Sequence, residues 1–203
     1  MKQLEEETEE KIFLAAQHIF QAKGFQGARM QEIADKAGIN KSMLHYYYRN
    51  KDTLFLKVFQ TSLSKIMPEL FTILSSKVPL EQKVNQIVDF YYGIFEKNHH
   101  LPSFVIYEMN RNPQRFKDFV ASMDVKLPEH FAKQIQEAVS SGKIMAIAPH
   151  QFLINVVSLC MMPVIARVMV QTLFKLNDAA YRVFLEERKE LIPKIIFSGV
   201  QPP

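Results

Sequence analysis

Apolar residues recur at helical spacing along almost all of the 203-residue chain, and this pattern restricts the fold more than any other feature. Between residues 8 and 22, one such stripe consists of Ile12, Phe13, Ala16, Ile19 and Phe20. Glycine, which weakens helices, occurs only 6 times. No stretch alternates apolar and polar residues for long enough to predict a strand. The sequence therefore predicts an all-α protein.

Capping residues, glycines and prolines divide this pattern into separate helices. We expect helices at about residues 8–22, 30–37, 41–48, 51–75, 79–97, 103–110, 113–140, 149–176 and 177–197. Thr8 is the predicted N-cap of the first helix, and residues 98–102 are predicted to form a loop. Proline interrupts helices, so we expect a break near Pro128 and kinks at Pro68 and Pro193.

Several classes of protein do not fit this composition. Cys160 is the only cysteine, so the chain cannot form an internal disulfide and suits a reducing compartment. The acidic N-terminus has no apolar signal segment, and the apolar run at 156–170 is too interrupted to span a bilayer. We therefore expect a cytoplasmic protein that is not inserted in a membrane.

Sequence motifs for catalysis are also missing. The chain has no Gly-rich phosphate loop, no Gly-x-Ser-x-Gly and no pair of metal ligands at i, i+4. We expect no catalytic residues, no cofactor and no metal site. His99 and His100 are read as solvated loop residues, and Cys160 as a buried small residue with a redox sensor as the minor alternative.

Residues 30–55 have the pattern of two short helices that cross closely. Ala34 and Ala37 are small enough to let a second helix approach the first, and Gly38 allows a tight turn. Ile39 can then fill the joint, and Leu44 can anchor the second helix in the core. This arrangement predicts a helix-turn-helix whose second helix faces outward.

The second helix is unusually aromatic, with Tyr46, Tyr47 and Tyr48 in succession. Phenol groups on a solvent-facing helix can contact phosphates and base edges, although Tyr48 shares the face of the core anchor and is expected to be buried. Residues 23–59 contain seven basic and three acidic residues, a net charge of +4 that equals the net charge of the whole chain. Such a segment suits the DNA backbone.

Residues 24–55 closely resemble the TetR family of transcriptional regulators. The shared pattern is a Gly-aromatic pair, an Ile-Ala pair, an Ala-Gly-Ile turn, a tyrosine-rich recognition helix and a Lys-Asp-x-Leu start to the next helix. In this chain it reads Gly24-Phe25, Ile33-Ala34, Ala37-Gly38-Ile39, Leu44-His45-Tyr46-Tyr47-Tyr48 and Lys51-Asp52-Thr53-Leu54. The resemblance covers about a quarter of the chain and implies a DNA-binding domain at 1–50 and a helical ligand-binding and dimerisation domain at 51–203.

The resemblance also implies which residues contact double-stranded operator DNA. We expect these to be Arg29, Lys41, Ser42, Met43, His45, Tyr46, Tyr47 and Lys51. The chain departs from the family in having Ala28-Arg29 where Thr or Ser usually caps the second helix. It also has His45 for a common Tyr and Tyr48 for a common Phe. These departures bear on operator preference.

The resemblance further implies that the C-terminal part binds a small apolar effector and that its last two long helices join a second copy of the chain, and the sequence supports both more weakly. The helix predicted at 149–176 is apolar on most of its circumference, so it needs cover on several sides, and a two-fold four-helix interface would supply it. The residues predicted to bind the effector are Tyr92, Phe95, Phe104, Tyr107, Glu108, Arg111 and Met123. Simple core packing remains the alternative for each of them.

The function that follows is a repressor, released from its operator by an apolar ligand. An enzyme, or a helical protein that grips another protein with its aromatic helix, is the alternative class. A turnover assay would distinguish an enzyme from the repressor. Binding to a protein partner but not to DNA would favour the protein-binding alternative.

Overall fold

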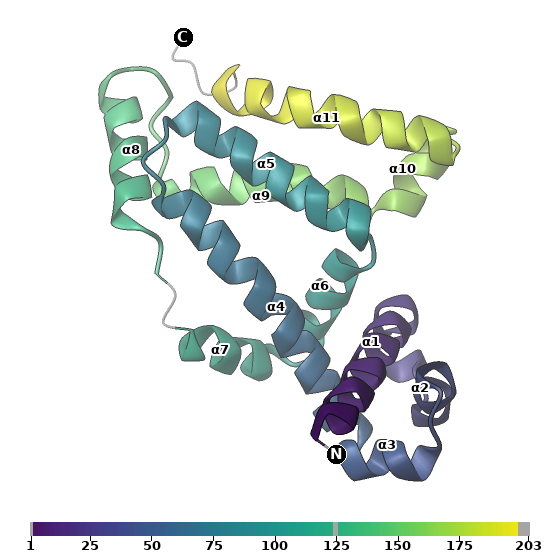
Figure 1. The fold of residues 1–203 in the computed structure, drawn as a ribbon. Coiled ribbons are helices and arrows are strands. Elements are labelled where there is room, and N and C mark those ends of the chain that lie inside the picture. The colour runs from purple at the N-terminus through teal and green to yellow at the C-terminus, as the bar shows by residue number, and fades with distance from the viewer. Residues whose placement is uncertain (1, 124–125, 199–203) are drawn as a thin grey trace. The chain divides into compact units, whose positions relative to one another are not determined.

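The structure is a computed structural model that describes residues 2–123 and 126–198. In these ranges every regular element is an α-helix, as the sequence predicts (Figure 1). The helices are α1 (Lys2–Gly27), α2 (Met30–Ala37), α3 (Lys41–Tyr47), α4 (Lys51–Ser75), α5 (Leu80–Lys97), α6 (Leu101–Arg111), α7 (Pro113–Ser122), α8 (Glu129–Ser140), α9 (Pro149–Ile165), α10 (Arg167–Leu173) and α11 (Asp178–Ser198).

By packing, the chain forms two compact units, and α4 and α6 each contribute to both. Unit 1 consists of residues 1–66 and 103–123, and unit 2 of residues 67–102 and 124–203. The predicted domains at 1–50 and 51–203 divide the chain differently. Unit 1 also includes the first part of α4, most of α6 and all of α7. The two units are defined by which residues pack together and not by what they bind. The predicted division into a DNA-binding and a ligand-binding domain therefore stays a prediction.

An aromatic cluster holds unit 1 together. Phe55 on α4 is fully buried, and its ring lies 5.0 Å from that of Phe20, 5.1 Å from that of Phe25 and 5.2 Å from that of Phe104. Edge-to-face and tilted ring pairs at these spacings are favourable. The cluster joins α1, α4 and α6 within unit 1.

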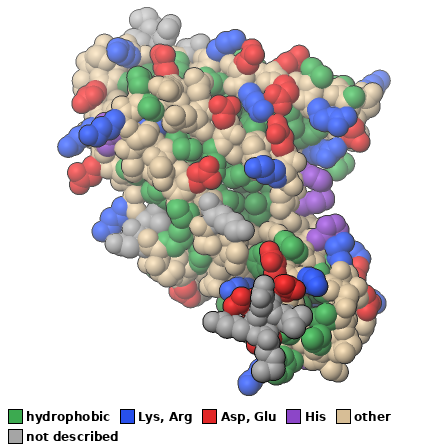
Figure 2. Space-filling view, in the orientation of Figure 1, with side chains coloured by type: hydrophobic (Ala, Val, Ile, Leu, Met, Phe, Trp, Pro, Cys, Tyr) green, Lys and Arg blue, Asp and Glu red, His purple; other side chains and the backbone are tan. Residues whose placement is uncertain are grey.

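Unit 2 packs α5, α8, α9 and α11 around an apolar core that includes Ile87, Phe131, Phe152 and Val156. A lysine lies inside this unit: Lys83 is fully buried, and its Nζ donates to the carbonyls of Leu74 at 2.6 Å and Ser76 at 2.8 Å. Burial lowers the pKa of Lys83. The ammonium caps the carbonyl end of α4. On the face seen in Figure 2, basic and acidic side chains are mixed over this unit.

Three boundaries differ from those predicted. Thr8 is not an N-cap, because α1 begins at Lys2 and the glutamate-rich start of the chain, rich in good helix formers, continues the helix. The predicted loop at 98–102 is shorter, since α6 begins at Leu101. The helix predicted at 149–176 is two helices, α9 and α10, bent by 70° at a break at Ala166.

Pro163 leaves one backbone carbonyl of α9 without its usual hydrogen-bond donor, just before this break. Proline has no N–H to give the carbonyl of Leu159 four residues earlier. Arg188 of α11 supplies the missing donor, with its Nη2 3.0 Å from the Leu159 oxygen. The Tyr181 hydroxyl donates to the carbonyl of Pro163 at 3.0 Å. Side chains of α11 therefore satisfy backbone groups that an unbroken helix would satisfy itself.

Among the described helices, none is by itself both long and apolar enough to cross a membrane; only the bent pair α9 and α10 meets that test, taken together.

Candidate nucleic-acid interface and sensor region

The turn between α2 and α3 is built as the sequence predicts. Gly38 adopts φ 70°, and its N–H points to the carbonyls of Ala34 and Asp35, which ends α2 in a left-handed cap. The side chain of Asn40 then accepts a hydrogen bond from the Met43 N–H at 2.8 Å and starts α3. Ala34 and Ala37 are buried, so α3 packs closely on α2.

α3 is attached to unit 1 by very few side chains. Leu44 is its only buried residue, and Tyr48, the C-cap, is buried beside it. The Tyr48 hydroxyl donates to Glu9 Oε1 at 3.0 Å, which ties the end of α3 to α1. Burial, followed by this bond to Glu9, raises the pKa of Tyr48, so the hydroxyl stays a donor at physiological pH. The prediction that Tyr48 is core is confirmed.

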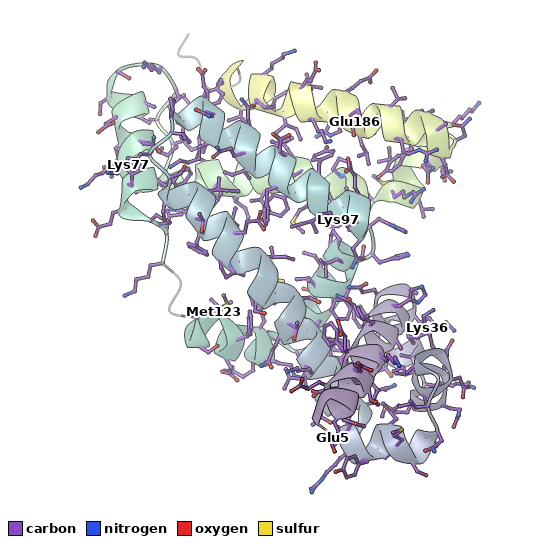
Figure 3. All side chains as sticks on the ribbon, in the orientation of Figure 1. Glu5, Lys36, Lys77, Lys97, Met123 and Glu186 are labelled. Atoms are coloured by element: carbon purple, nitrogen blue, oxygen red, sulfur yellow. The ribbon has the colours of Figure 1, made fainter. Side chains whose placement is uncertain are left out.

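The remaining side chains of α3 are exposed or half-buried; Figure 3 draws the described side chains on the ribbon. Tyr46 is 80% exposed, and its ring stands at 90° to that of the half-buried Tyr47, with 5.5 Å between centroids. The other predicted DNA contacts of α3 are also exposed: Lys41, Ser42, Met43 and His45. Arg29 lies exposed at the N-cap of α2 and makes no side-chain capping bond there. The exposed residues of α3, which are Lys41, Ser42, Met43, His45 and Tyr46, together with the half-buried Tyr47, are called the α3 surface below.

Lys51 differs from the rest of the predicted contacts, because its ammonium is engaged inside unit 1. Its Nζ donates to the carbonyls of Phe25 at 2.9 Å and Ala28 at 3.0 Å, and lies 4.4 Å from the centre of the Phe25 ring. These bonds use two of its three N–H groups. The third is left for a phosphate, so that contact stays a prediction.

Lys51→Ala is therefore expected to have two effects. Loss of both hydrogen bonds should lower the free energy of unfolding by about 1–3 kcal/mol, and affinity for DNA should fall as well. Lys41→Ala removes an exposed lysine of α3, so it should lower the affinity for DNA and leave the free energy of unfolding unchanged. Urea unfolding and DNA titration of both variants test this; an unchanged stability of the Lys51 variant would contradict the internal role.

The seven residues predicted to bind the effector are distributed over both units. Tyr92 and Phe95 lie in unit 2, and the other five, Phe104, Tyr107, Glu108, Arg111 and Met123, lie in unit 1. Phe104 belongs to the aromatic cluster, 5.2 Å from Phe55, and Tyr107 is 44% exposed. Met123 is the half-buried C-cap of α7. Within unit 1, Phe104 is thus buried, whereas Tyr107 is exposed and Met123 half-buried, and their part in effector binding stays a prediction.

Glu108 and Arg111 carry polar groups into the interior of unit 1. Glu108 is 1% exposed, and its Oε1 accepts from Arg115 Nη1 and Asn112 Nδ2, both at 2.9 Å. The Arg111 guanidinium lies 4.0 Å from the centre of the Phe25 ring, the same ring that Lys51 contacts. Within the described residues, Glu108 Oε2 and Arg111 Nη1 are buried without a hydrogen bond. No pattern in the sequence indicates the contact between Arg111 and Phe25.

Unit 2 contains the cavity that Tyr92 and Phe95 line. It has a volume of about 420 Å³ and lies between α5, the α9–α10 break and α11. Its lining residues are Tyr92, Phe95, Glu96, His99, Val164, Arg167, Asp178, Tyr181, Arg182, Leu185 and Glu186. Small-molecule sites in proteins span roughly 300–1,000 Å³. We call it the α5–α11 cavity.

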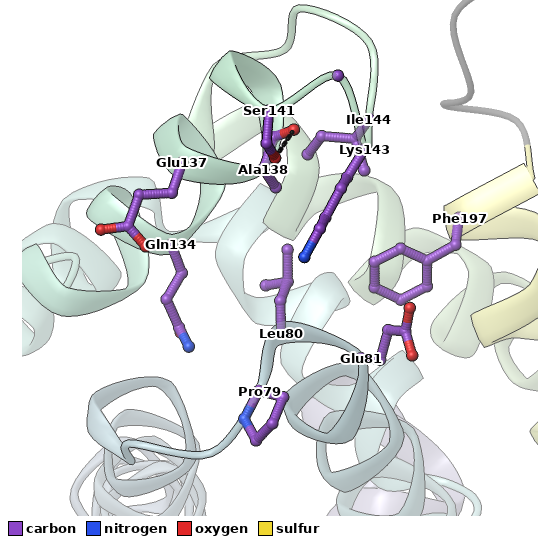
Figure 4. A pocket seen from close by; sticks show the side chains of 11 residues that line it. Pro79, Leu80, Glu81, Gln134, Glu137, Ala138, Ser141, Lys143, Ile144 and Phe197 are labelled. Atoms are coloured by element: carbon purple, nitrogen blue, oxygen red, sulfur yellow. Dashed lines mark hydrogen bonds between the residues drawn. The ribbon is translucent and has the colours of Figure 1, made fainter.

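A second hollow of unit 2, about 980 Å³, lies between the start of α5, the end of α8 and the end of α11 (Figure 4). The side chains of Gln134, Lys143 and Phe197 surround it, together with Glu81 and Glu137. None of the predicted effector residues lines it. The described residues contain no cluster of three or more His, Cys, Asp or Glu side chains able to hold a metal ion.

Comparison with known proteins agrees with this architecture. Residues 12–58 match the family described as "Bacterial regulatory proteins, tetR family". The probable HTH-type transcriptional regulator YttP of Bacillus subtilis is 24% identical over 199 residues, which cover 95% of each chain. The transcriptional activator FasR of Mycolicibacterium smegmatis is 27% identical over 85 residues, 42% of this chain and 39% of that protein. The fold resembles that of FadR from Bacillus subtilis in complex with stearoyl-CoA, with a TM-score of 0.66, 15% identity and coverage of 94% and 98%.

Proposed function

The chain belongs to the TetR family of bacterial regulatory proteins and is a transcriptional regulator, and on this premise we propose that it is a homodimeric repressor that a small apolar molecule releases from operator DNA. The observation that carries the proposal is the α3 surface, where Tyr46 is 80% exposed on a helix with a single buried residue, Leu44. A protein that acts on chromosomal DNA works in the cytoplasm.

The α3 surface fits the chemistry of a major groove. An α-helix fits the width of that groove, and its outward side chains then meet base edges and flanking phosphates. On α3, the hydroxyls of Ser42 and Tyr46 can exchange hydrogen bonds with bases, and the methyl of Met43 can contact thymine. Lys41 and Arg29 supply positive charge for phosphates at the edge of the groove.

Homodimerisation is supported by an apolar surface of unit 2. Exposed apolar side chains recur along α9, α10 and α11, where Val168 is 78% and Phe174 66% exposed. The set, which we call the α9–α11 stripe, is Ile154, Met162, Ile165, Val168, Met169, Leu173, Phe174, Val183, Leu191 and Ile195. Extended exposed apolar surface of this kind marks a protein interface. A second copy of the chain, related by two-fold symmetry, would bury it and set two α3 helices about 34–36 Å apart on DNA.

Release by an effector requires that unit 2 and unit 1 be coupled. α4 runs through both units, so a ligand that changes unit 2 can act on the α3 surface through this helix. The ligand must bind the released form more tightly than the DNA-bound form, by several kcal/mol for a switch of orders of magnitude. FasR is named an activator, so the direction of regulation is part of what is tested.

The deciding experiment is a titration of the DNA upstream of the protein's own gene with the purified full chain. We expect saturable binding at submicromolar dimer and a steep loss of affinity with salt. Lys41→Ala should weaken it, whereas Lys133→Ala, an exposed lysine of α8, should not. No binding at micromolar protein in low salt, or equal binding to unrelated DNA, contradicts the proposal. A reporter driven by the same DNA shows repression or activation.

His45 should contribute to operator preference. Its Nδ1 lies 3.2 Å from the Arg49 carbonyl, which can only accept, so Nδ1 carries the proton and Nε2 is left to face outward. His45→Tyr introduces the more common family residue and should shift the preferred base at one or two positions of each half-site, with affinity for the original DNA changed less than about tenfold. Selection from a randomised DNA pool measures this; identical preferred sequences for both proteins would refute it.

A further inference from the structure

The far end of α3 is attached to unit 1 by a hydrogen bond that a helix-turn-helix does not in general require. Leu44 is the only buried residue within α3, and Tyr48 follows it one turn later as the C-cap. One buried side chain fixes the position of a seven-residue helix, about 10 Å long, but not its tilt. Tyr48 supplies the second point of attachment.

The hydroxyl of Tyr48 gives this attachment a defined direction. It donates to Glu9 Oε1 at 3.0 Å in a part-buried position. A hydrogen bond to a carboxylate is strong and directional, whereas apolar contact alone has no preferred direction and lets a ring shift. Burial, followed by the bond to Glu9, raises the pKa of Tyr48, so the hydroxyl keeps its proton at neutral pH.

Glu9 is itself held in place by the core of unit 1. Because α1 begins at Lys2, Glu9 lies about two turns inside the helix and not in its first turn. Ile12, the next residue but two, is fully buried and anchors this stretch of α1. Residues 9, 12 and 48 all belong to unit 1. The bond therefore joins the end of α3 to a helix that the core fixes.

The charge of Glu9 alone would act on DNA binding in the opposite direction. A carboxylate near a DNA interface repels phosphates, so its removal would raise the affinity for any DNA if charge were the whole effect. Glu10, the next residue, is also exposed, and Glu10→Ala removes the same charge while leaving the bond to Tyr48 intact. The sign of the change in affinity therefore separates a positioning role from an electrostatic one.

We propose that Tyr48 and Glu9 are positioning residues of the DNA interface: their hydrogen bond sets the tilt of α3 and, through it, the base contacts of the α3 surface. The inference rests on the proposed function for its meaning in DNA recognition. Contacts to base edges depend on this geometry, whereas attraction to phosphates does not. It also explains a departure from the family pattern, since phenylalanine, common at position 48, cannot make the bond.

Titration of the full chain with the upstream DNA, and with unrelated DNA of equal length, tests this role. Tyr48→Phe should lower the affinity for the upstream DNA about tenfold, about threefold at each half-site, and change that for unrelated DNA less than about twofold. Glu9→Ala should lower the upstream affinity at least as much, and the double variant no further, because both remove one bond. Alanine favours helix and phenylalanine retains the ring, so these variants are expected to fold.

Two further variants serve as controls for Glu9→Ala. Glu9→Gln keeps an acceptor oxygen at the same place and should retain most of the affinity for the upstream DNA. Glu10→Ala should leave the affinity for both DNAs unchanged or raise it. A loss of upstream affinity in Glu10→Ala equal to that in Glu9→Ala would contradict the positioning role.

Amide hydrogen exchange tests the same bond without DNA. The N–H of Leu44 donates to the Asn40 carbonyl at 3.1 Å, and that of Tyr48 to the Leu44 carbonyl at 2.8 Å, so both report local opening of α3. Tyr48→Phe should speed their exchange about fivefold. The N–H of Ile33 in α2, which donates to the Arg29 carbonyl, should keep its rate.

Several outcomes would overturn the proposal. These are unchanged exchange of α3 in Tyr48→Phe, an unchanged ratio of upstream to unrelated affinity, and additive effects in the double variant. An equal rise of exchange in α2 and α3 would do the same, because it would show a general loss of stability. If the unaltered protein did not bind the upstream DNA while α3 exchange responded as expected, the proposed function would fail and the bond would still hold α3.

Discussion

Tyr46→Ala is expected to weaken operator binding by about 100-fold while leaving the stability of the protein unchanged. The ring is 80% exposed, so its removal creates no cavity in unit 1. A side-chain contact to DNA is worth about 1–3 kcal/mol, and a dimer loses it at both half-sites. A loss of about 1.4 kcal/mol at each site gives a factor of ten twice. Fluorescence anisotropy with the upstream DNA measures the change.

Tyr107→Ala is the matched control, because Tyr107 is also a partly exposed tyrosine but lies on α6, away from the α3 surface. It should retain full affinity in the absence of effector. Thermal unfolding of both variants should coincide with that of the unaltered protein. If Tyr46→Ala bound the DNA normally, α3 could not be the recognition helix in the form proposed.

A double variant, Val183→Asp with Leu191→Asp, is expected to convert the dimer into a monomer. The two side chains are 58% and 45% exposed in the single chain, so the aspartates meet water there at little cost. In the dimer the same carboxylates would be buried in an apolar interface without partners, which costs several kcal/mol for each charge. Light scattering should show half the mass, and operator affinity should fall at least 100-fold, because one α3 helix no longer positions the other.

Arg182→Asp introduces the same side chain on the same helix, on the flank outside the α9–α11 stripe. It should leave the mass unchanged. If the double variant remained a dimer, another surface would join the two copies. If the unaltered protein were already a monomer at micromolar concentration, the proposed interface would have no basis.

The helix-turn-helix could be predicted from the sequence because its signals are local. Gly38 ends one helix and Asn40 starts the next, and both do so through backbone groups within five residues of themselves. The bounds of α2 were predicted to the residue, and α3 ends one residue early at Tyr47. Both ends of α1 differ from the prediction: a run of glutamates extends the helix past the expected cap at Thr8, and the other end lies at Gly27 instead of about residue 22, with Gly24 non-helical inside it.

The cavity and the break in α9 could not be predicted, because both depend on which distant helices pack together. The spacing of Tyr92, Phe95 and Glu96 on one side of α5 is visible in the sequence, but nothing there says that this side faces α11. Pro163 marks a defect in α9, yet whether the chain bends depends on Arg188 and Tyr181 taking over the backbone groups. For the same reason, the sequence offered core packing of Phe104 only as an alternative to effector binding and did not indicate Phe55 and Phe59 as its neighbours.

Because Leu44 alone anchors α3 from within the helix, the outward positions of that helix are open to exchange without refolding the protein. A library that randomises residues 42, 43, 45 and 46 would vary the recognised sequence while the fold and the sensor remain as they are. Under the proposed function, one such protein could yield a set of mutually independent genetic switches that answer to the same chemical input.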